Sequence, residues 1–135
     1  MREIFTDTRL AYSKAFIFVM ENFVEILKQG HSELSLCINN SMMVTYAIDN
    51  GEVVGACVYE IDAVKRQAWI YTAGVAAAHR GQGIYDDIYS EVEHQCRNAG
   101  MLVLNSNIHV DNAGMIANAK KHGRLLSWYR TSKQL

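Results

Sequence analysis

The sequence VAAAHRGQGI, residues 75–84, joins the end of an apolar run to the start of a helix through a basic turn that contains two glycines. Glycine lets the backbone approach an anion closely. The helix expected from Gly81 to Asn98 would direct its first N–H groups at the same place, and Arg80 adds a charge that pairs with phosphate oxygens. The stretch predicts a phosphate-binding turn, although such turns also carry glycine for geometric reasons alone.

Two common nucleotide-binding motifs are absent from this turn. The G-x-G-x-x-G pattern of dinucleotide-binding folds does not occur, and no G-K-[S/T] follows the glycines as in a Walker A loop. The residues by themselves therefore indicate an anion site without specifying the ligand.

Composition limits the class of protein. With 135 residues, half of them hydrophobic, the chain is expected to form a single domain over residues 1–135 with a substantial core. A net charge of −1 gives no electrostatic support for a nucleic-acid partner. The apolar run Ala15–Met20 is too short to span a bilayer, and no signal peptide is recognisable, so a cytoplasmic protein without a membrane partner is expected.

The cysteines do not form a recognisable framework. Cys37, Cys57 and Cys96 are odd in number, widely spaced, and lack the spacing of a zinc site. We expect buried thiols in a reducing compartment and no metal.

Before the turn, the pattern predicts one helix and three strands. The helix spans Thr8 to Gln29, with Thr6 or Asp7 as its cap and Gly30 at its end. Its apolar face carries Phe16, Met20, Phe23 and Leu27, while residues 31–40 are either a loop or a second short helix. The strands Met42–Ile48, Val53–Ile61 and Ala68–Ala76 form an antiparallel meander, because Asn50-Gly51 is a strong hairpin signal.

After the turn, helices and strands alternate. The helix that ends near Asn98 presents Ile84, Ile88, Val92 and Cys96 on one side. A strand at Met101–Ile108, a helix at Asn112–His122 and a last strand at Arg124–Thr131 follow. The fold class expected is α/β (α+β), with a mixed, mostly antiparallel sheet and helices on both faces.

The stretch from Arg80 to Ile84 resembles the acetyl-CoA pyrophosphate loop of the GNAT superfamily of N-acetyltransferases, whose pattern is R/Q-x-x-G-x-G/A. Other features stand in the family's order: a valine five residues before the arginine, then a strand, an asparagine, and a glycine eleven residues after that asparagine. These are Val75, Leu102–Leu104, Asn112 and Gly123, and the resemblance covers roughly Ser41 to Arg130.

The resemblance implies acetyl-CoA as cosubstrate and a set of residues to hold it. Its pantetheine arm would hydrogen-bond to the backbone near Ala73 and Val75, as an added strand would. The turn would hold the pyrophosphate, and Asn112, which is equally suited to cap a helix, would contact the cofactor arm. The expected cofactor-binding residues are Ala73, Val75, Arg80, Gly81, Gln82, Gly83, Ile84, Tyr85 and Asn112.

The implied reaction is direct transfer of an acetyl group to a primary amine in a ternary complex. The amine, on a small molecule, a peptide N-terminus or a lysine, attacks the thioester carbonyl, and a backbone N–H stabilises the oxyanion. A general acid protonates the thiolate and a base removes the amine proton.

The chain departs from the family pattern at three places. Tyr85 stands where the loop usually has a small residue and would either point away or crowd the loop. Asp86 and Asp87 suit a helix N-terminus but would repel a pyrophosphate that they faced. Ala119 occupies the position of the tyrosine that many members use as general acid.

Acid and base candidates must therefore come from elsewhere. The fourth strand carries no acidic residue, so Glu60, Tyr71 and Tyr129 are the catalytic candidates, with Ser127, His109 or a water chain as alternatives. Trp69 and Trp128 are expected to be packing residues or walls of the acceptor pocket.

The C-terminal end is short. The family usually ends with a two-stranded hairpin, and only its first strand is expected here, which would leave an edge that a second copy of the chain could cover as a homodimer. Two other classes of function fit the same sequence: a catalytically weak CoA-binding or regulatory protein, and an interaction module with no cofactor.

Overall fold

The protein is described here by a computed structural model over residues 2–28, 42–108 and 112–125. The rest of the chain lies outside the described residues. It includes Cys37, Gly30, His109, Ser127, Trp128, Tyr129, the part of the predicted Arg124–Thr131 strand that follows Leu125, and the strand edge expected to form a homodimer. The described elements, in chain order, are β1 (Glu3–Asp7), a 3-10 turn η1 (Leu10–Tyr12), α1 (Phe16–Lys28), β2 (Met42–Asp49), β3 (Glu52–Asp62), β4 (Gln67–Val75), a 3-10 turn η2 (Ala77–His79), α2 (Ile84–Asn98), β5 (Val103–Ser106) and α3 (Ala113–Lys121).

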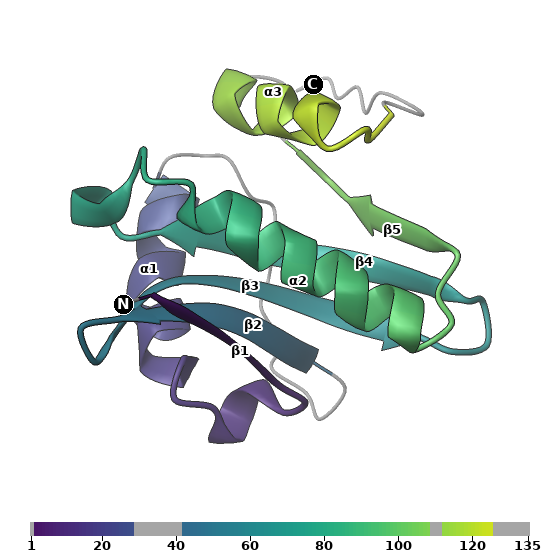
Figure 1. Cartoon of the computed structure of the whole chain (residues 1–135), viewed down its shortest axis with the longest axis horizontal. Helices are drawn as coiled ribbons and strands as arrows, with labels where there is room; N and C mark the ends of the chain where they lie inside the picture. Colours follow the sequence, from purple (N-terminus) through teal and green to yellow (C-terminus); the bar gives the residue numbers. More distant parts are fainter. Residues whose placement is uncertain (1, 29–41, 109–111, 126–135) are drawn as a thin grey trace, which may run out of the picture.

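The described strands form one sheet in the order β1-β2-β3-β4-β5 (Figure 1). All neighbours are antiparallel except β4 and β5, which are parallel. The predicted hairpin is confirmed: Asn50 and Gly51 form the two-residue turn between β2 and β3, with φ angles of 51° and 79°. The mixed, mostly antiparallel sheet is therefore as predicted.

Helices cover both faces of the sheet, as the sequence predicted. In Figure 1, α2 lies in front of the sheet and α1 behind it. The strands alternate accordingly, because successive side chains point to opposite faces. Cys57 and Tyr59 of β3 pack with the α2 side, together with Ile88, while Val58 packs with Val19 on the α1 side. Cys57 and Cys96 are free and buried, as expected.

The N-terminal prediction was wrong in two respects. Residues Glu3–Asp7 form the edge strand β1, which pairs with β2 from Glu3↔Ile48 to Asp7↔Val44. The first helix begins at Phe16, not at Thr8, so Thr6 and Asp7 are strand residues and do not cap it. The late start of the helix has a local cause: the Asp7 carboxylate accepts a hydrogen bond from Ser13 Oγ at 2.7 Å, and that Oγ accepts one from the Ala15 N–H at 3.1 Å.

Other boundaries moved by a few residues. The helix predicted from Gly81 begins at Ile84, because Gly81 and Gly83 have left-handed φ angles of 78° and 75°. The strand predicted over Met101–Ile108 is shorter, at Val103–Ser106. Within residues 2–28, 42–108 and 112–125, no helix is long and apolar enough to cross a membrane.

Candidate active site

The parallel strands β4 and β5 separate part-way along their length. Pairing runs from Gln67↔Val103 to Ile70↔Ser106 and then stops, while β4 stays paired with β3 on its other side as far as Val75. Figure 1 shows β5 diverging toward α3. From Tyr71 to Val75, the β4 edge that faces β5 therefore has no partner strand in the described part of the chain.

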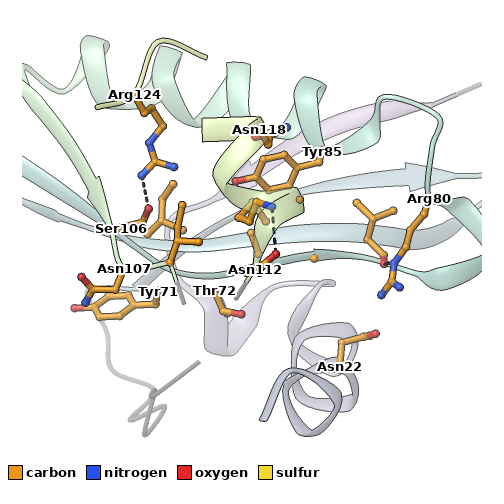
Figure 2. Close-up of a pocket in the computed structure, with 17 residues that line it drawn as sticks. Asn22, Tyr71, Thr72, Arg80, Tyr85, Ser106, Asn107, Asn112, Asn118 and Arg124 are labelled. Carbon is orange, nitrogen blue, oxygen red and sulfur yellow. Dashed lines mark hydrogen bonds between the residues drawn. The ribbon is translucent and has the colours of Figure 1, made fainter. Parts of the chain in front are cut away.

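A cleft of about 430 Å³ opens along this edge (Figure 2). The backbone of β4 forms one wall, and residues from α1, α2, α3 and the segment after β5 complete it. Lining side chains that the sequence did not single out include Asn22, Thr72, Ser106, Asn107, Asn118 and Arg124. An exposed strand edge beside a cleft can hydrogen-bond a peptide-like chain along its length.

Tyr71 marks the point where the strands part. In the register of β3 and β4, Val58 pairs with Thr72 but Tyr59 pairs with Ile70, so Tyr71 is an extra residue that forms a bulge. Tyr71 lines the cleft, and its hydroxyl donates a hydrogen bond to Glu60 Oε2 at 3.1 Å. Burial and the neighbouring Glu60 raise the pKa of the Tyr71 phenol, so it remains protonated at neutral pH.

The basic turn closes one end of the cleft. Gly83 is the N-cap residue of α2, and glycine has no side chain that could cap the first N–H groups of the helix. Arg80 Nε donates to the Val75 carbonyl oxygen at 3.1 Å, which joins the end of β4 to the turn. A second hollow of about 220 Å³ lies here, and Arg80 lines both hollows. The turn thus places a cation and a helix N-terminus together, which suits an anion.

The predicted cofactor-binding residues gather around these two hollows. The cleft is lined by Ala73, Val75, Arg80, Tyr85 and Asn112, and the hollow at the turn by Val75, Arg80, Gly81, Gly83, Ile84 and Tyr85. Gln82 lines neither of them, and its carbonyl oxygen accepts a hydrogen bond from Arg2 Nη1 at 3.0 Å.

Comparison with known proteins identifies the fold family. A model of the acetyltransferase (GNAT) family matches residues 5–123. The chain belongs to this family. It is accordingly an acyltransferase that uses acetyl-CoA as cosubstrate. A search of curated proteins found no match.

Solved structures show the same fold at low sequence identity. An aminoglycoside acetyltransferase, HMB0005, from an uncultured soil metagenomic sample superposes with a TM-score of 0.76 at 16% identity, covering 100% of this chain and 99% of that one. A ribosomal-protein-alanine N-acetyltransferase from Brucella melitensis biovar Abortus 2308 gives 0.74 at 14%, covering 100% and 99%. The acetyltransferase AAC(6')-Iy, solved with the bisubstrate analogue CoA-S-monomethyl-acetylneamine, gives 0.67 at 14%, covering 100% and 98%.

Two of the acetyltransferase's departures from the family pattern now have a structural account. The Tyr85 ring stacks on Tyr89, with centroids 6.3 Å apart, and forms a wall of the cleft; burial raises its pKa. The acidic pair is neutralised on both sides. Asp87 forms an ion pair with Arg2 at 2.8 Å, and the Asp86 carboxylate binds three side chains of the α3 region, namely Asn118, Lys121 and His122.

The third departure leaves the acid position empty. Ala119 is buried, with 6% of its surface exposed, and carries no group that could donate a proton. Asn112 caps α3, because its Oδ1 accepts from the Met115 N–H at 3.2 Å, and it also lines the cleft. The capping role of Asn112 is therefore observed, while its contact with the cofactor stays a prediction.

The structure brings together two of the three catalytic candidates. Glu60 and Tyr71 are hydrogen-bonded, whereas Tyr129 lies outside the described residues. Trp69 is 36% exposed and is not among the residues that line the cleft, so it is not a wall of this cavity.

Asp86 fixes α3 to the start of α2 and should make this contact acid-sensitive. Hydrogen bonds from Lys121 and His122 lower the pKa of Asp86 from 3.8 to about 2. A carboxylate with a lowered pKa stabilises the fold above its unfolded pKa, and this stabilisation is lost as the pH falls through the folded value. We expect the difference in unfolding free energy between wild type and Asp86→Asn to be largest above about pH 4 and to vanish toward about pH 2, as measured by denaturation at each pH. A difference that stays constant over this range would contradict the assignment.

Proposed function

We propose that the acetyltransferase transfers the acetyl group of acetyl-CoA to a primary amine by direct attack in a ternary complex. The observation that carries this proposal is the unpaired β4 edge from Tyr71 to Val75, which leads along the cleft to the Arg80–Gly83 turn. The pantetheine arm hydrogen-bonds to that edge, the diphosphate binds at the turn, and the thioester reaches the bulge at Tyr71.

The proposed chemistry uses the hydrogen-bonded pair of Tyr71 and Glu60. The amine nitrogen forms a bond to the thioester carbon, and a backbone N–H of β4 stabilises the oxyanion. As the amine loses its proton to the Tyr71 oxygen, the Tyr71 hydroxyl proton passes to Glu60, 3.1 Å away. The C–S bond then breaks and the thiolate takes a proton, either from Tyr129 or from water.

The acceptor is a primary amine on a small molecule, a peptide N-terminus or a lysine. The similar structures include an aminoglycoside acetyltransferase and a ribosomal-protein-alanine N-acetyltransferase, so both small-molecule and peptide amines belong in the trial panel. At 16% and 14% identity, these structures do not choose between them.

Two measurements test this function in sequence. Acetyl-CoA should raise the thermal midpoint of the acetyltransferase, because a ligand that binds only the folded state stabilises it. Release of free thiol should then occur with at least one amine of a panel that contains aminoglycosides, peptides with an N-terminal alanine, and lysine. No thermal shift at millimolar acetyl-CoA would contradict the proposal.

A second candidate function is a regulatory, CoA-binding role in which catalysis is weak. The buried Ala119 at the family's acid position favours it. This candidate predicts the same thermal shift but only marginal thiol release with every amine of the panel.

A further inference from the structure

The N-terminal arginine reaches the diphosphate turn from the opposite edge of the sheet. Arg2 directly precedes β1, the edge strand farthest from β5, yet its guanidinium contacts the turn 80 residues away in the sequence. In Figure 1, the N-terminus lies at the same end of the sheet as the start of α2. We propose that Arg2 is a positioning residue that holds the Gln82–Gly83 peptide in the orientation required for diphosphate binding. This inference rests on the proposed function.

The geometry of one peptide unit supports this role. Arg2 Nη1 donates to the Gln82 carbonyl oxygen at 3.0 Å. In a trans peptide, the C=O of one residue and the N–H of the next point in opposite directions. Holding the Gln82 oxygen toward Arg2 therefore directs the Gly83 N–H away from Arg2. Gly83 lines the hollow at the turn and Gln82 does not, which agrees with that direction.

The charge of Arg2 supports the same role. The Arg2 Nη2 atom lies 2.8 Å from Asp87 Oδ2, in the first turn of α2. An unpaired carboxylate at this position would repel a bound diphosphate, so pairing with Arg2 removes an unfavourable interaction. The two contacts use separate nitrogens of one guanidinium, whose planar, forked shape suits such double recognition.

Arg2 acts through the turn and does not bind the ligand itself. It lines neither the cleft nor the hollow at the turn, whereas Arg80 lines both. No pattern in the sequence indicates this role, because the contact depends on how β1 pairs at the far edge of the sheet.

Steady-state kinetics with two acetyl donors, one with and one without the diphosphate, test the positioning role of Arg2. Hydrogen bonds to charged groups are among the stronger ones, so Arg2→Gln should raise KM for acetyl-CoA by about five- to tenfold while kcat stays within about twofold. With acetyl-pantetheine, which lacks the diphosphate, KM should not change. Arg97→Gln is the matched control, because Arg97 pairs with Glu93 at the other end of the same helix. This variant should leave KM unchanged for both acetyl-CoA and acetyl-pantetheine.

Asp87→Asn separates the two contacts of Arg2. This variant removes the ion pair but leaves the Gln82 contact, so KM for acetyl-CoA should stay within about twofold of wild type. A rise in KM as large as that in Arg2→Gln would overturn the role given to the Gln82 carbonyl. Equal rises in KM for acetyl-CoA and acetyl-pantetheine in Arg2→Gln would show a merely structural role and would overturn the proposal.

Amide hydrogen exchange without ligand tests whether Arg2 holds the Gln82–Gly83 peptide, even if the proposed function fails. The Asp87 N–H bonds to the Gly83 carbonyl oxygen at 3.2 Å, so it reports the first turn of α2. Arg2→Gln should speed exchange at residues 83–87 and leave β2 and β3 protected. Unchanged amide exchange in Arg2→Gln would overturn the positioning role of Arg2. Failure of wild type to bind acetyl-CoA would instead contradict the proposed function and the ligand role of the turn.

Discussion

Replacing Arg80 by glutamine and Gly83 by valine together should abolish stabilisation by acetyl-CoA and lower kcat/KM by roughly 10²- to 10³-fold. Loss of a charged hydrogen bond to phosphate costs about 1.5–3 kcal/mol. Valine at the left-handed Gly83, whose φ is 75°, displaces the turn, and each further hydrogen bond to the diphosphate that is lost with it costs a similar amount. Each 1.4 kcal/mol corresponds to about a factor of ten. Thermal shift and steady-state kinetics measure the two effects.

Gly51→Val is the matched control for the strain at Gly83. Gly51 has a φ of 79°, and an added Cβ would meet no atom within 4 Å at either glycine. The two valine substitutions should therefore cost similar backbone energy, but Gly51 lies in the hairpin between β2 and β3, away from the cleft. The control should lose stability and keep its affinity for acetyl-CoA. An Arg80→Gln/Gly83→Val protein that folds and still binds acetyl-CoA as wild type does would place the diphosphate elsewhere.

Replacing Glu60 by glutamine should lower kcat by about 10²-fold and leave acetyl-CoA binding unchanged. A positioned general base typically contributes 10²–10⁴-fold, and glutamine keeps the shape of Glu60 but cannot take the proton passed on by Tyr71. Tyr71→Phe should cost a similar factor, and the double variant should cost little more, because residues that act as one unit are not additive. Additive reductions in kcat would contradict proton transfer through the Tyr71–Glu60 pair.

Two further measurements test the proton transfer through Tyr71 to Glu60. Glu52→Gln changes an exposed carboxylate at the other end of β3 and should leave kcat unchanged. Because the pKa of Tyr71 is raised above 10.0, its deprotonation should not limit the rate below that pH. A fall in activity between pH 8 and pH 10 that disappears in Tyr71→Phe would show that the tyrosine titrates lower and acts differently.

The parts of the fold that could be predicted are those with strong local signals. The apolar spacing of Ile84, Ile88 and Val92 predicted a helix on the sheet, and all three are buried on the face of α2 that packs against the sheet. The Asn50-Gly51 pair predicted the hairpin, because both residues adopt positive φ readily. The glycine-bearing turn after β4 likewise predicted that Arg80 and Gly83 border the same hollow.

The parts that could not be predicted depend on long-range pairing. The alternation of polar and apolar residues in Glu3–Asp7 is only five residues long, which is too short to indicate a strand. Thr6 and Asp7 also suit a helix cap, so the sequence did not predict β1. The bulge at Tyr71 shifts the β3–β4 register by one residue, and no local pattern in the sequence indicates that shift or the hydrogen bond between Tyr71 and Glu60. Arg2 had no sequence signal, because its partners are fixed by the position of β1 at the edge of the sheet.

A crystal structure with bound CoA tests the central claim most directly. We expect diphosphate oxygens about 3 Å from backbone nitrogens in the Gly81–Ile84 segment, with the pantetheine arm running along β4 from Val75 toward Tyr71. CoA bound away from this turn, or an empty cleft in crystals saturated with CoA, would contradict the account.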